Sequence, residues 1–269
     1  MNPHLSIVIP AYNEAAILPV TLDCLHTFLT QQSFTAEVIV VDDGSRDRTP
    51  SLIGEWQASF ERIRLLRNPV NLGKGASIQR GVLASRGEYV FVTDADLPGR
   101  PEDILRLLRA LREGAAIAIA SRPPAPMRCA PSRSRFVASL VYRAMVRAIL
   151  NLPLRDTQCG FKAFVRKPVV PVFEALQLGG FSFDVEFLYA AWKRDLVIRE
   201  IDFEVVERRA TRHAILLHSP RMMLDLLRIR FASGRGPIQG LPESVELKLS
   251  ANPSEQHYLT QDYNLPRQK

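Results

Sequence analysis

The sequence predicts an α/β fold in which a mostly parallel β-sheet is flanked by helices. Short, uninterrupted apolar runs recur through the first half of the chain, as is typical of parallel strands buried on both faces. Amphipathic segments separate these runs, and such alternation indicates strands joined by crossover helices. Ligands of these sheets bind beyond the carboxyl ends of the strands. A functional site is therefore expected at that edge.

The expected elements follow one another in regular order. Strands are expected at residues 5–10, 37–43, 63–68, 88–96 and 115–122. Helices are expected at residues 15–29, 50–60, 75–84 and 101–111, with Thr49 as the N-cap of the second. Two basic amphipathic helices are expected near residues 133–150 and 219–231, the latter capped by Ser219 and started by Pro220. Residues 234–269 are rich in Pro, Gln, Ser and Asn, which indicates a poorly ordered polar tail.

The composition is that of a soluble globular protein of 269 residues, 46% hydrophobic and 23% charged. That length suits one large domain or two small ones. The sequence contains three cysteines, an odd number, at Cys24, Cys129 and Cys159. They lack CxxC spacing, so neither a disulfide framework nor a zinc site is indicated. A reducing, cytoplasmic setting fits best. The N-terminus lacks the build of a signal peptide, and no stretch is long and apolar enough to cross a bilayer.

The net charge of +7 favours anionic partners. Arginines crowd between Arg122 and Arg147 and again between Arg208 and Arg235. A solvated charged face is the simplest interpretation of such runs. Aromatic residues that could stack on bases do not interleave with the charges, so nucleic acid is not expected as a partner.

The stretch VFVTDADLPG places two acids, Asp94 and Asp96, directly after an apolar run. At positions i and i+2 of a strand the two carboxylates would point the same way, and such crowding costs free energy unless a cation lies between them. Alternatively they cap the helix expected to begin near Pro101, although Glu102 and Asp103 already meet that need. The residues alone leave both interpretations open.

Polar residues gather at the other strand ends as well. The first expected strand finishes in PAYNE, the second in VDDGS and the fifth in ASR. The segment NLGKGAS adds Lys74 at the start of a helix, where backbone N–H groups and an ammonium would suit a phosphate. It lacks the spacing of a P-loop, and no GxGxxG follows the first strand. ATPase and dinucleotide-dependent oxidoreductase chemistry are therefore not indicated.

The ordered motifs SIVIPAYNE, VIVVDDGSRDRT, NLGKGASIQRG and GEYVFVTDAD resemble those of the family 2 glycosyltransferases. The resemblance implies the GT-A fold, a Rossmann-like sheet that binds a nucleotide sugar, with a smaller acceptor-side region. RDTQCGFKAFVR and FSFDVEFLYAA are similar to the branch that glycosylates polyprenyl phosphates, particularly the dolichyl-phosphate β-glucosyltransferases. We accordingly expect a donor half at residues 1–122 and an acceptor-side half of the same domain at residues 123–233.

The same resemblance assigns a donor site. Asp96, with Asp94 close by and Ala95 between them, would hold Mg²⁺ or Mn²⁺ against the diphosphate, because a leaving UDP needs a hard cation with oxygen ligands. Pro10, Tyr12 and Glu14 would wall the nucleoside, Asp42 and Asp43 would reach the uracil and ribose, and Lys74 and Arg122 would face the phosphates. Relatives that transfer mannose often read DADLQHPP. Here Pro98 replaces the Gln, so water or a phosphate oxygen must complete the metal shell.

The acceptor side follows from the second half of the chain. Arg135 corresponds to an arginine of relatives whose acceptor is a lipid phosphate, and Arg133 lies beside it. Asp156 and Gln158 would contact sugar hydroxyls or shape the acceptor entrance. By pattern alone the basic amphipathic helices either lie on a membrane or pack in the core with a solvated face. The resemblance favours peripheral association with the inner, cytoplasmic face of the membrane.

Three residues of the second half have competing interpretations. Cys159 could be a nucleophile, but no histidine is near it in sequence and a small buried thiol is the favoured interpretation. Asp184 is expected to cap the helix that it begins or to face the sugar. Glu186 cannot cap that helix and could face the sugar instead.

These observations predict an inverting, metal-dependent hexosyltransferase that moves glucose from UDP-glucose to a polyprenyl phosphate, either dolichyl or undecaprenyl. A phosphate monoester needs no strong base, so Arg122, Arg133 and Arg135 would only hold it in line. Glucose follows from the resemblance alone. The second interpretation is a saccharide or soluble hydroxyl acceptor with Asp184 as base, and the third is a catalytically silent basic binding module.

Overall fold

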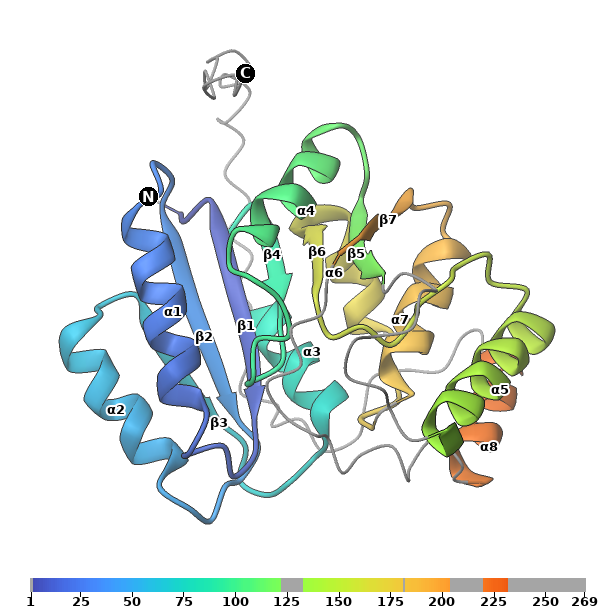
Figure 1. The fold of residues 1–269 in the computed structure, drawn as a ribbon, viewed down its shortest axis with the longest axis horizontal. Helices are drawn as coiled ribbons and strands as arrows, with labels where there is room; N and C mark the ends of the chain where they lie inside the picture. The colour runs from blue at the N-terminus through green and yellow to red at the C-terminus, as the bar shows by residue number, and fades with distance from the viewer. Residues whose placement is uncertain (1, 122–132, 181, 204–219, 232–269) are drawn as a thin grey trace.

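The structure, a computed structural model, describes residues 2–121, 133–180, 182–203 and 220–231. A single seven-stranded sheet forms its centre, in the order β3-β2-β1-β4-β6-β5-β7 (Figure 1). The strands are β1 Leu5–Ala11, β2 Ala36–Asp42, β3 Ile63–Arg67, β4 Tyr89–Val92, β5 Ile117–Ser121, β6 Lys162–Val165 and β7 Ile198–Asp202. The predicted α/β fold with a mostly parallel sheet is confirmed.

One strand runs against the others. β6 pairs antiparallel with β4 on one side, where Lys162 lies opposite Val92, and with β5 on the other. The remaining neighbours are parallel. Because β6 is reversed, its first residue lies at the edge where the parallel strand β4 ends. The loop that precedes β6 is thereby brought to the edge where ligands bind in such sheets.

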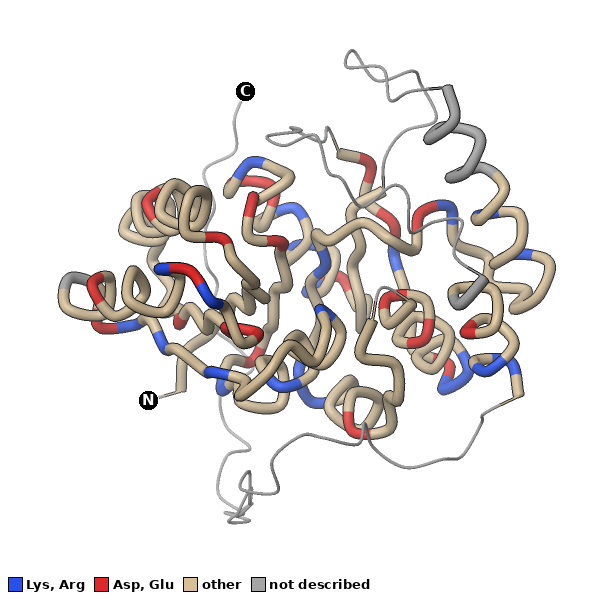
Figure 2. Tube along the Cα trace, turned by 90° about the horizontal axis from the view of Figure 1, so that it is seen from below, with Lys and Arg blue, Asp and Glu red and all other residues tan. Residues whose placement is uncertain are grey.

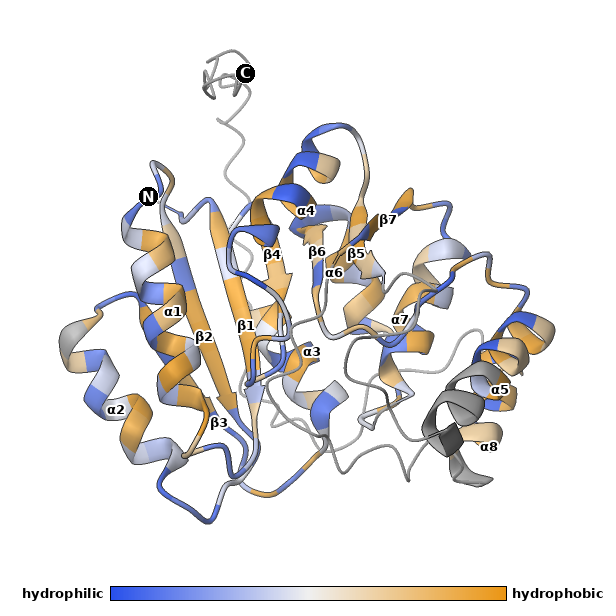
Figure 3. Cartoon of the chain, in the orientation of Figure 1, coloured by the Kyte–Doolittle hydropathy of each residue, from blue (hydrophilic) through white to orange (hydrophobic). Residues whose placement is uncertain are grey.

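Helices cover both faces of the sheet, and their bounds are α1 Leu18–Thr30, α2 Thr49–Ser59, α3 Lys74–Ala84, α4 Asp103–Arg112, α5 Arg133–Leu150, α6 Arg166–Glu174, α7 Phe183–Trp192 and α8 Pro220–Phe231. One buried cluster joins α1, α2 and α4 to the sheet. The other joins the sheet to the remaining helices, which are α3, α5, α6, α7 and α8. Figure 3 shows the apolar strands between these layers. Side chains alternate between the two clusters, since Ile7 and Ile9 belong to the first and Val8 to the second.

Most predicted elements are confirmed with shifted ends. The helix expected from residue 15 begins at Leu18, after a turn in which Asn13 takes a φ of 55°. Thr49 is not the N-cap of α2, because that helix begins at Thr49 itself and Arg48 holds the cap position. Pro220 starts α8 as predicted. Ser219, Cys129 and the tail at 234–269 lie outside the described residues.

The fourth predicted strand is too long. β4 ends at Val92, and Asp94 and Asp96 lie in a turn that the Leu97 N–H closes on the Asp94 carbonyl at 3.0 Å. The strand stops where its partner β6 begins, so no ladder remains to extend it. The assumption that the two acids share one face of a strand is therefore wrong. Within the described ranges no helix is both long and apolar enough to span a membrane.

Candidate active site

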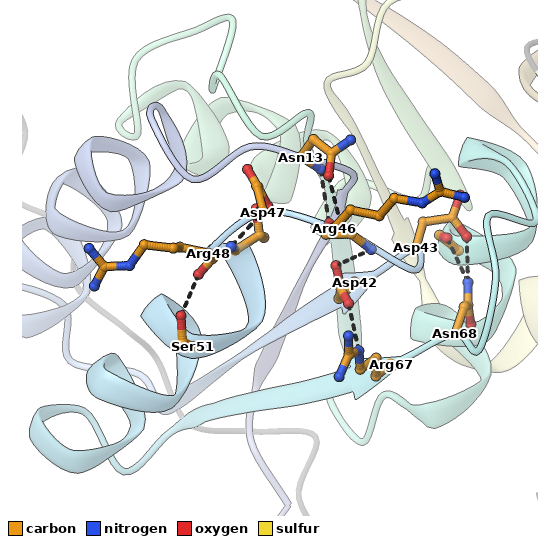
Figure 4. Close-up of polar contacts among 12 residues, drawn as sticks. Asn13, Asp42, Asp43, Arg46, Asp47, Arg48, Ser51, Arg67 and Asn68 are labelled. Atoms are coloured by element: carbon orange, nitrogen blue, oxygen red, sulfur yellow. Dashed lines mark hydrogen bonds and ion pairs between the residues drawn. The ribbon is translucent and has the colours of Figure 1, made fainter.

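The loops that follow β1 and β2 are joined by hydrogen bonds at the carboxyl edge of the sheet (Figure 4). Asn13 donates its backbone N–H to Ser45 Oγ at 2.9 Å, and its Oδ1 accepts the Arg46 N–H at 2.9 Å. The Glu14 N–H donates to Thr49 Oγ1 at 2.9 Å. The PAYNE and DDGS motifs are therefore joined to each other, and Tyr12 is exposed beside them.

Asp42 ends β2 with a fully buried side chain. Its Oδ1 accepts the Ser45 N–H at 3.2 Å. Its Oδ2 lies 3.2 Å from Arg67 Nε in an ion pair, yet receives no hydrogen bond from any described group. Because a buried acceptor without a hydrogen bond is costly, this oxygen is a candidate to receive a ligand N–H.

Asp43 is also buried, but its oxygens are occupied by the chain itself. Oδ1 accepts Asn68 Nδ2 at 2.7 Å and the Leu72 N–H at 2.9 Å, and Oδ2 accepts the Gly73 N–H at 2.9 Å. These bonds fix the loop that leads into α3. The Asp43 contacts therefore position Lys74, the first residue of that helix, and its contact with a ribose stays a prediction.

Lys74 reaches across the sheet edge to the acid turn. Its Nζ lies 2.5 Å from Asp94 Oδ1, and the two side chains are 22% and 35% exposed. Burial lowers the pKa of the Lys74 ammonium, but the nearby carboxylates of Asp94 and Asp184 raise it by more, so the pKa lies above its usual range. The structure thus joins two predicted site residues, and Asp94 is paired with an ammonium instead of capping α4.

Two backbone amides in the first turn of α3 are occupied by the chain itself. The Gly179 carbonyl accepts the Gly75 N–H at 2.7 Å and the Ala76 N–H at 3.3 Å. This carbonyl belongs to the loop between α6 and α7, which Glu186 holds by accepting the N–H groups of Gln177 and Leu178. The prediction that helix-end amides hold a phosphate is therefore wrong for Gly75 and Ala76, and the contact of the Lys74 side chain with a phosphate stays a prediction.

Asp94 and Asp96 are the residues predicted to hold a hard cation, and the space beside Asp94 is narrow. A Cβ at position 160 would overlap the Asp94 carboxylate, so the absence of a side chain at Gly160 makes room for that of Asp94. Carboxylate oxygens are the ligands that Mg²⁺ and Mn²⁺ prefer. No cluster of three His, Cys, Asp or Glu side chains suited to a metal occurs in the described part of the chain. A metal held by Asp94 and Asp96 would therefore need phosphate or water oxygens to complete its shell.

Asp184 is paired with a buried lysine. Lys162 Nζ lies 2.7 Å from Asp184 Oδ1 and also donates to the Cys159 carbonyl. Asp184 lies in the first turn of α7. Ser182 holds the N-cap position of this helix, and no described side chain makes a capping hydrogen bond. The prediction that Asp184 caps this helix is wrong. Glu186 is bound to backbone amides, and burial raises its pKa although those hydrogen bonds lower it.

The loop before β6 holds the other predicted residues of the second half. Asp156 is buried, accepts the Gln158 N–H at 3.2 Å, and lies 3.9 Å from the Arg143 guanidinium of α5. The Cys159 side chain is buried, as predicted. Asp156 is thus tied to its own loop and to α5, and its contact with a sugar stays a prediction.

The cationic acceptor residues are only partly described. Arg122 lies outside the described residues, and so do the side chains of Arg133 and Arg135, although both belong to the first turn of α5. Sequence reasoning missed Gly160, Lys162 and Arg67 as neighbours of the site. Of these three, only Lys162 could have been noticed in the sequence, because it lies within the motif RDTQCGFK. Its partner Asp184 lies on a helix distant in sequence.

The two basic helices lie side by side at one end of the molecule (Figure 2). Four apolar side chains of α8 are exposed: Met223 at 38%, Leu224 at 54%, Leu227 at 42% and Phe231 at 81%. Arg228 lies among them, 64% exposed. Val141 of α5 is exposed as well. An apolar surface of this kind with basic neighbours indicates an interaction face.

Comparison with known proteins gives consistent matches. The family described as glycosyl transferase family 2 matches residues 6–172. The dolichyl-phosphate beta-glucosyltransferase of Dictyostelium discoideum is 33% identical over 246 residues, which cover 86% of this chain and 75% of the relative. The enzyme of that name from Homo sapiens is 34% identical over 248 residues, covering 86% and 76%.

Solved structures match as well. Glucosyl-3-phosphoglycerate synthase from Mycobacterium tuberculosis, in complex with Mg²⁺ and uridine-diphosphate, aligns with a TM-score of 0.65 at 22% identity, covering 85% of this chain and 79% of that one. A complex of the same enzyme with Mn²⁺, uridine-diphosphate-glucose and phosphoglyceric acid aligns with a TM-score of 0.62, covering 86% and 79%. At this identity the likeness shows a shared fold.

Proposed function

The chain belongs to glycosyl transferase family 2, and we propose that it is a metal-dependent, inverting enzyme that moves glucose from UDP-glucose to a polyprenyl phosphate. The observation that carries the proposal is the similarity to dolichyl-phosphate beta-glucosyltransferases over 86% of the chain. Family membership and the GT-A fold agree with the resemblance seen in the sequence. The donor, acceptor and metal are the proposed part.

The donor is assigned to the edge beyond β1, β2 and β4. The buried Asp42 Oδ2, which receives no hydrogen bond from the described residues, supports a contact with the uracil N–H. Pro10, Tyr12 and Glu14 would line the nucleoside, and Lys74 and Arg122 would meet the diphosphate. Asp94 and Asp96 would hold Mg²⁺ or Mn²⁺, which when bound stabilises the negative charge on the departing UDP.

The reaction needs little proton chemistry from the protein. An oxygen of the acceptor phosphate forms a bond to the anomeric carbon while the bond to the UDP oxygen breaks, and the electron pair leaves with UDP. Attack from the opposite side inverts α to β. Because the phosphate monoester is already anionic, arginines that hold it in line are sufficient. Arg122, Arg133 and Arg135 are assigned this role, and Asp156 and Gln158 are assigned to the acceptor entrance.

The pairing of Asp184 weighs against the second interpretation, in which Asp184 is the base for a hydroxyl acceptor. Lys162 occupies the Asp184 carboxylate at 2.7 Å, with both side chains nearly buried. One oxygen of this carboxylate is thus occupied by the chain itself, and moving Lys162 away would leave a buried charge without its partner. A phosphate acceptor requires no such base and so fits the site better.

The place of action is proposed to be the cytoplasmic face of a membrane, which the protein would bind peripherally. A polyprenyl phosphate keeps its headgroup at the membrane surface, so the active site must approach that surface. The exposed apolar side chains of α8, with Arg228 among them, suit insertion at an anionic interface.

The test supplies purified protein and Mn²⁺ with radiolabelled UDP-glucose and either a polyprenyl phosphate or the same polyprenol without its phosphate. We expect label in the lipid phase only with the phosphate, and GDP-mannose should not replace the donor. Transfer to a saccharide or to the polyprenol, with polyprenyl phosphate ignored, would favour the hydroxyl-acceptor interpretation. Absence of any transfer or UDP binding would favour the silent module.

A further inference from the structure

The Asp94 carboxylate is confined between an ammonium and the backbone. Lys74 Nζ lies 2.5 Å from its Oδ1, while its Oδ2 lies where a Cβ of residue 160 would project. Asp94 is also one of the two carboxylates assigned to the metal. A cation from the chain itself and a cation from solution are therefore directed at the same side chain.

We propose that Lys74 is a resident counter-ion of Asp94 that a metal ion must displace, and that this exchange makes metal binding depend on the nucleoside diphosphate. The inference rests on the proposed function, because it takes Asp94 as a metal ligand. It adds a property that the donor assignment does not contain, namely that the protein by itself disfavours the metal.

Electrostatics disfavours both cations on Asp94. An ammonium and a divalent ion on one carboxylate would lie only a few ångströms apart, where repulsion between like charges is strong in a partly buried site. Turning the carboxylate away does not resolve the conflict, because the backbone of Gly160 stands on its other side. Tight metal binding at Asp94 is therefore expected to move the Lys74 ammonium.

Release of Asp94 requires another anion for the Lys74 ammonium, which lies 2.5 Å from Asp94 Oδ1. Asp184 is not a vacant alternative partner, since Lys162 already lies 2.7 Å from it. Lys74 needs a new anion before it can release Asp94.

A diphosphate supplies that anion. Lys74 stands at the first position of α3 on a flexible four-carbon stem, so its ammonium can swing to a phosphate while the helix stays in place. Asp94 is then released for the metal, whose own charge the diphosphate also attracts. By linkage each ligand raises the affinity for the other by the same factor.

The test measures Mn²⁺ affinity, from the EPR signal of free Mn²⁺, with and without UDP. The proteins are wild type, Lys74→Met, Lys74→Arg, and the control Lys167→Met, which changes an exposed lysine of α6. We expect Lys74→Met to bind Mn²⁺ alone about tenfold more tightly than wild type, and its gain in Mn²⁺ affinity with UDP to be smaller by about the same factor. Lys74→Arg keeps the positive charge and should bind Mn²⁺ alone as weakly as wild type, whereas Lys167→Met should match wild type in both measurements. Thermal unfolding checks that each variant is folded.

Two results would overturn the inference while leaving donor binding intact. One is a folded Lys74→Met that binds Mn²⁺ alone no better than wild type. The other is a wild type that binds UDP but takes up Mn²⁺ equally well without it. If wild type binds neither UDP nor Mn²⁺, the proposed donor site itself is wrong, and the inference falls with it.

Discussion

Lys162 and Asp184 form an ion pair of 2.7 Å between β6 and α7, with side chains only 4% and 9% exposed. Asp184 is close enough to act on Lys74: burial lowers the pKa of Lys74, and the charges of Asp94 and Asp184 raise it by more. Charges of alternating sign thus connect the acid turn to the second half of the chain. Their energetic roles differ, because only the outer pair is open to solvent and ligands.

Breaking the buried pair should destabilise the fold. We expect Lys162→Met to lower the free energy of unfolding by about 3–5 kcal/mol, because Asp184 is left as an uncompensated buried charge. The double variant Lys162→Met, Asp184→Asn should recover part of this loss. Urea denaturation measures the free energy of unfolding of each variant. Arg109→Ala, which breaks an exposed pair with Glu113, should cost less than about 1 kcal/mol, and an equal loss in both variants would contradict the expectation.

Asp96→Asn should abolish glycosyl transfer and leave the fold intact. The substitution removes a charged oxygen ligand from the proposed metal site, and the expected loss in kcat is about a hundredfold or more. Initial rates with Mn²⁺ added measure the effect. Asp23→Asn, on an exposed position of α1, is the matched control and should be fully active. Full activity of wild type in excess EDTA would show that the metal assignment is wrong.

Gly160→Ala tests the space beside Asp94. The added Cβ would overlap the Asp94 carboxylate, which must then turn out of its observed position. We expect the affinity for Mn²⁺ with UDP to fall by about tenfold or more, as measured by calorimetry. Gly54→Ala is the control, because a Cβ there meets no atom within 4 Å. Unchanged metal affinity in Gly160→Ala would show that Asp94 is not a ligand of the metal.

Arg135→Ala should weaken acceptor binding specifically. If this arginine in the first turn of α5 holds the lipid phosphate, its loss removes a charge-assisted contact worth on the order of 1.5–3 kcal/mol. Steady-state kinetics should show a higher KM for the polyprenyl phosphate and an unchanged KM for UDP-glucose. Arg147→Ala, near the other end of α5, should leave both values alone. An acceptor KM that stays at its wild-type value would remove Arg135 from the site.

Membrane binding should depend on the apolar face of α8. We expect Leu224→Gln combined with Leu227→Gln to reduce co-sedimentation with anionic liposomes by about tenfold or more, because each leucine loses the gain from burial in the bilayer. Leu105→Gln, which changes an exposed leucine of α4, is the control. Rising salt should weaken wild-type binding. Equal binding to neutral liposomes would contradict the electrostatic part of the proposal.

The first half of the fold was predictable because its signals are local. Strands such as IVIP and VIVV are continuous apolar runs between amphipathic helices, and pattern alone identifies them. The reversed strand β6 has only four residues, and its partners lie far away in sequence. Nothing local marks such a strand. The end of β4 depends on where β6 begins, and the sequence therefore predicted an end several residues beyond Val92.

The site was predictable as a set of residues and less so as a set of contacts. The motifs identified Asp42, Asp43, Lys74 and Asp94, which the fold does bring to one edge. Their partners depend on three-dimensional packing: Asp43 anchors a loop, and Gly179 takes the helix-end amides. Residue type states which chemistry a side chain can do, whereas packing decides which neighbour it meets.

The position of β6 between β4 and β5 has a consequence for how the chain is made. β1 to β4 can assemble as soon as they are synthesised, since each pairs with a strand already present. β5 leaves the ribosome next, with an apolar sequence and no neighbour, because β6 and β7 are still to come. Unpaired strands of this kind are prone to aggregate. A fragment that ends at residue 122 would leave β5 without either of its strand partners, and we expect such a fragment to aggregate.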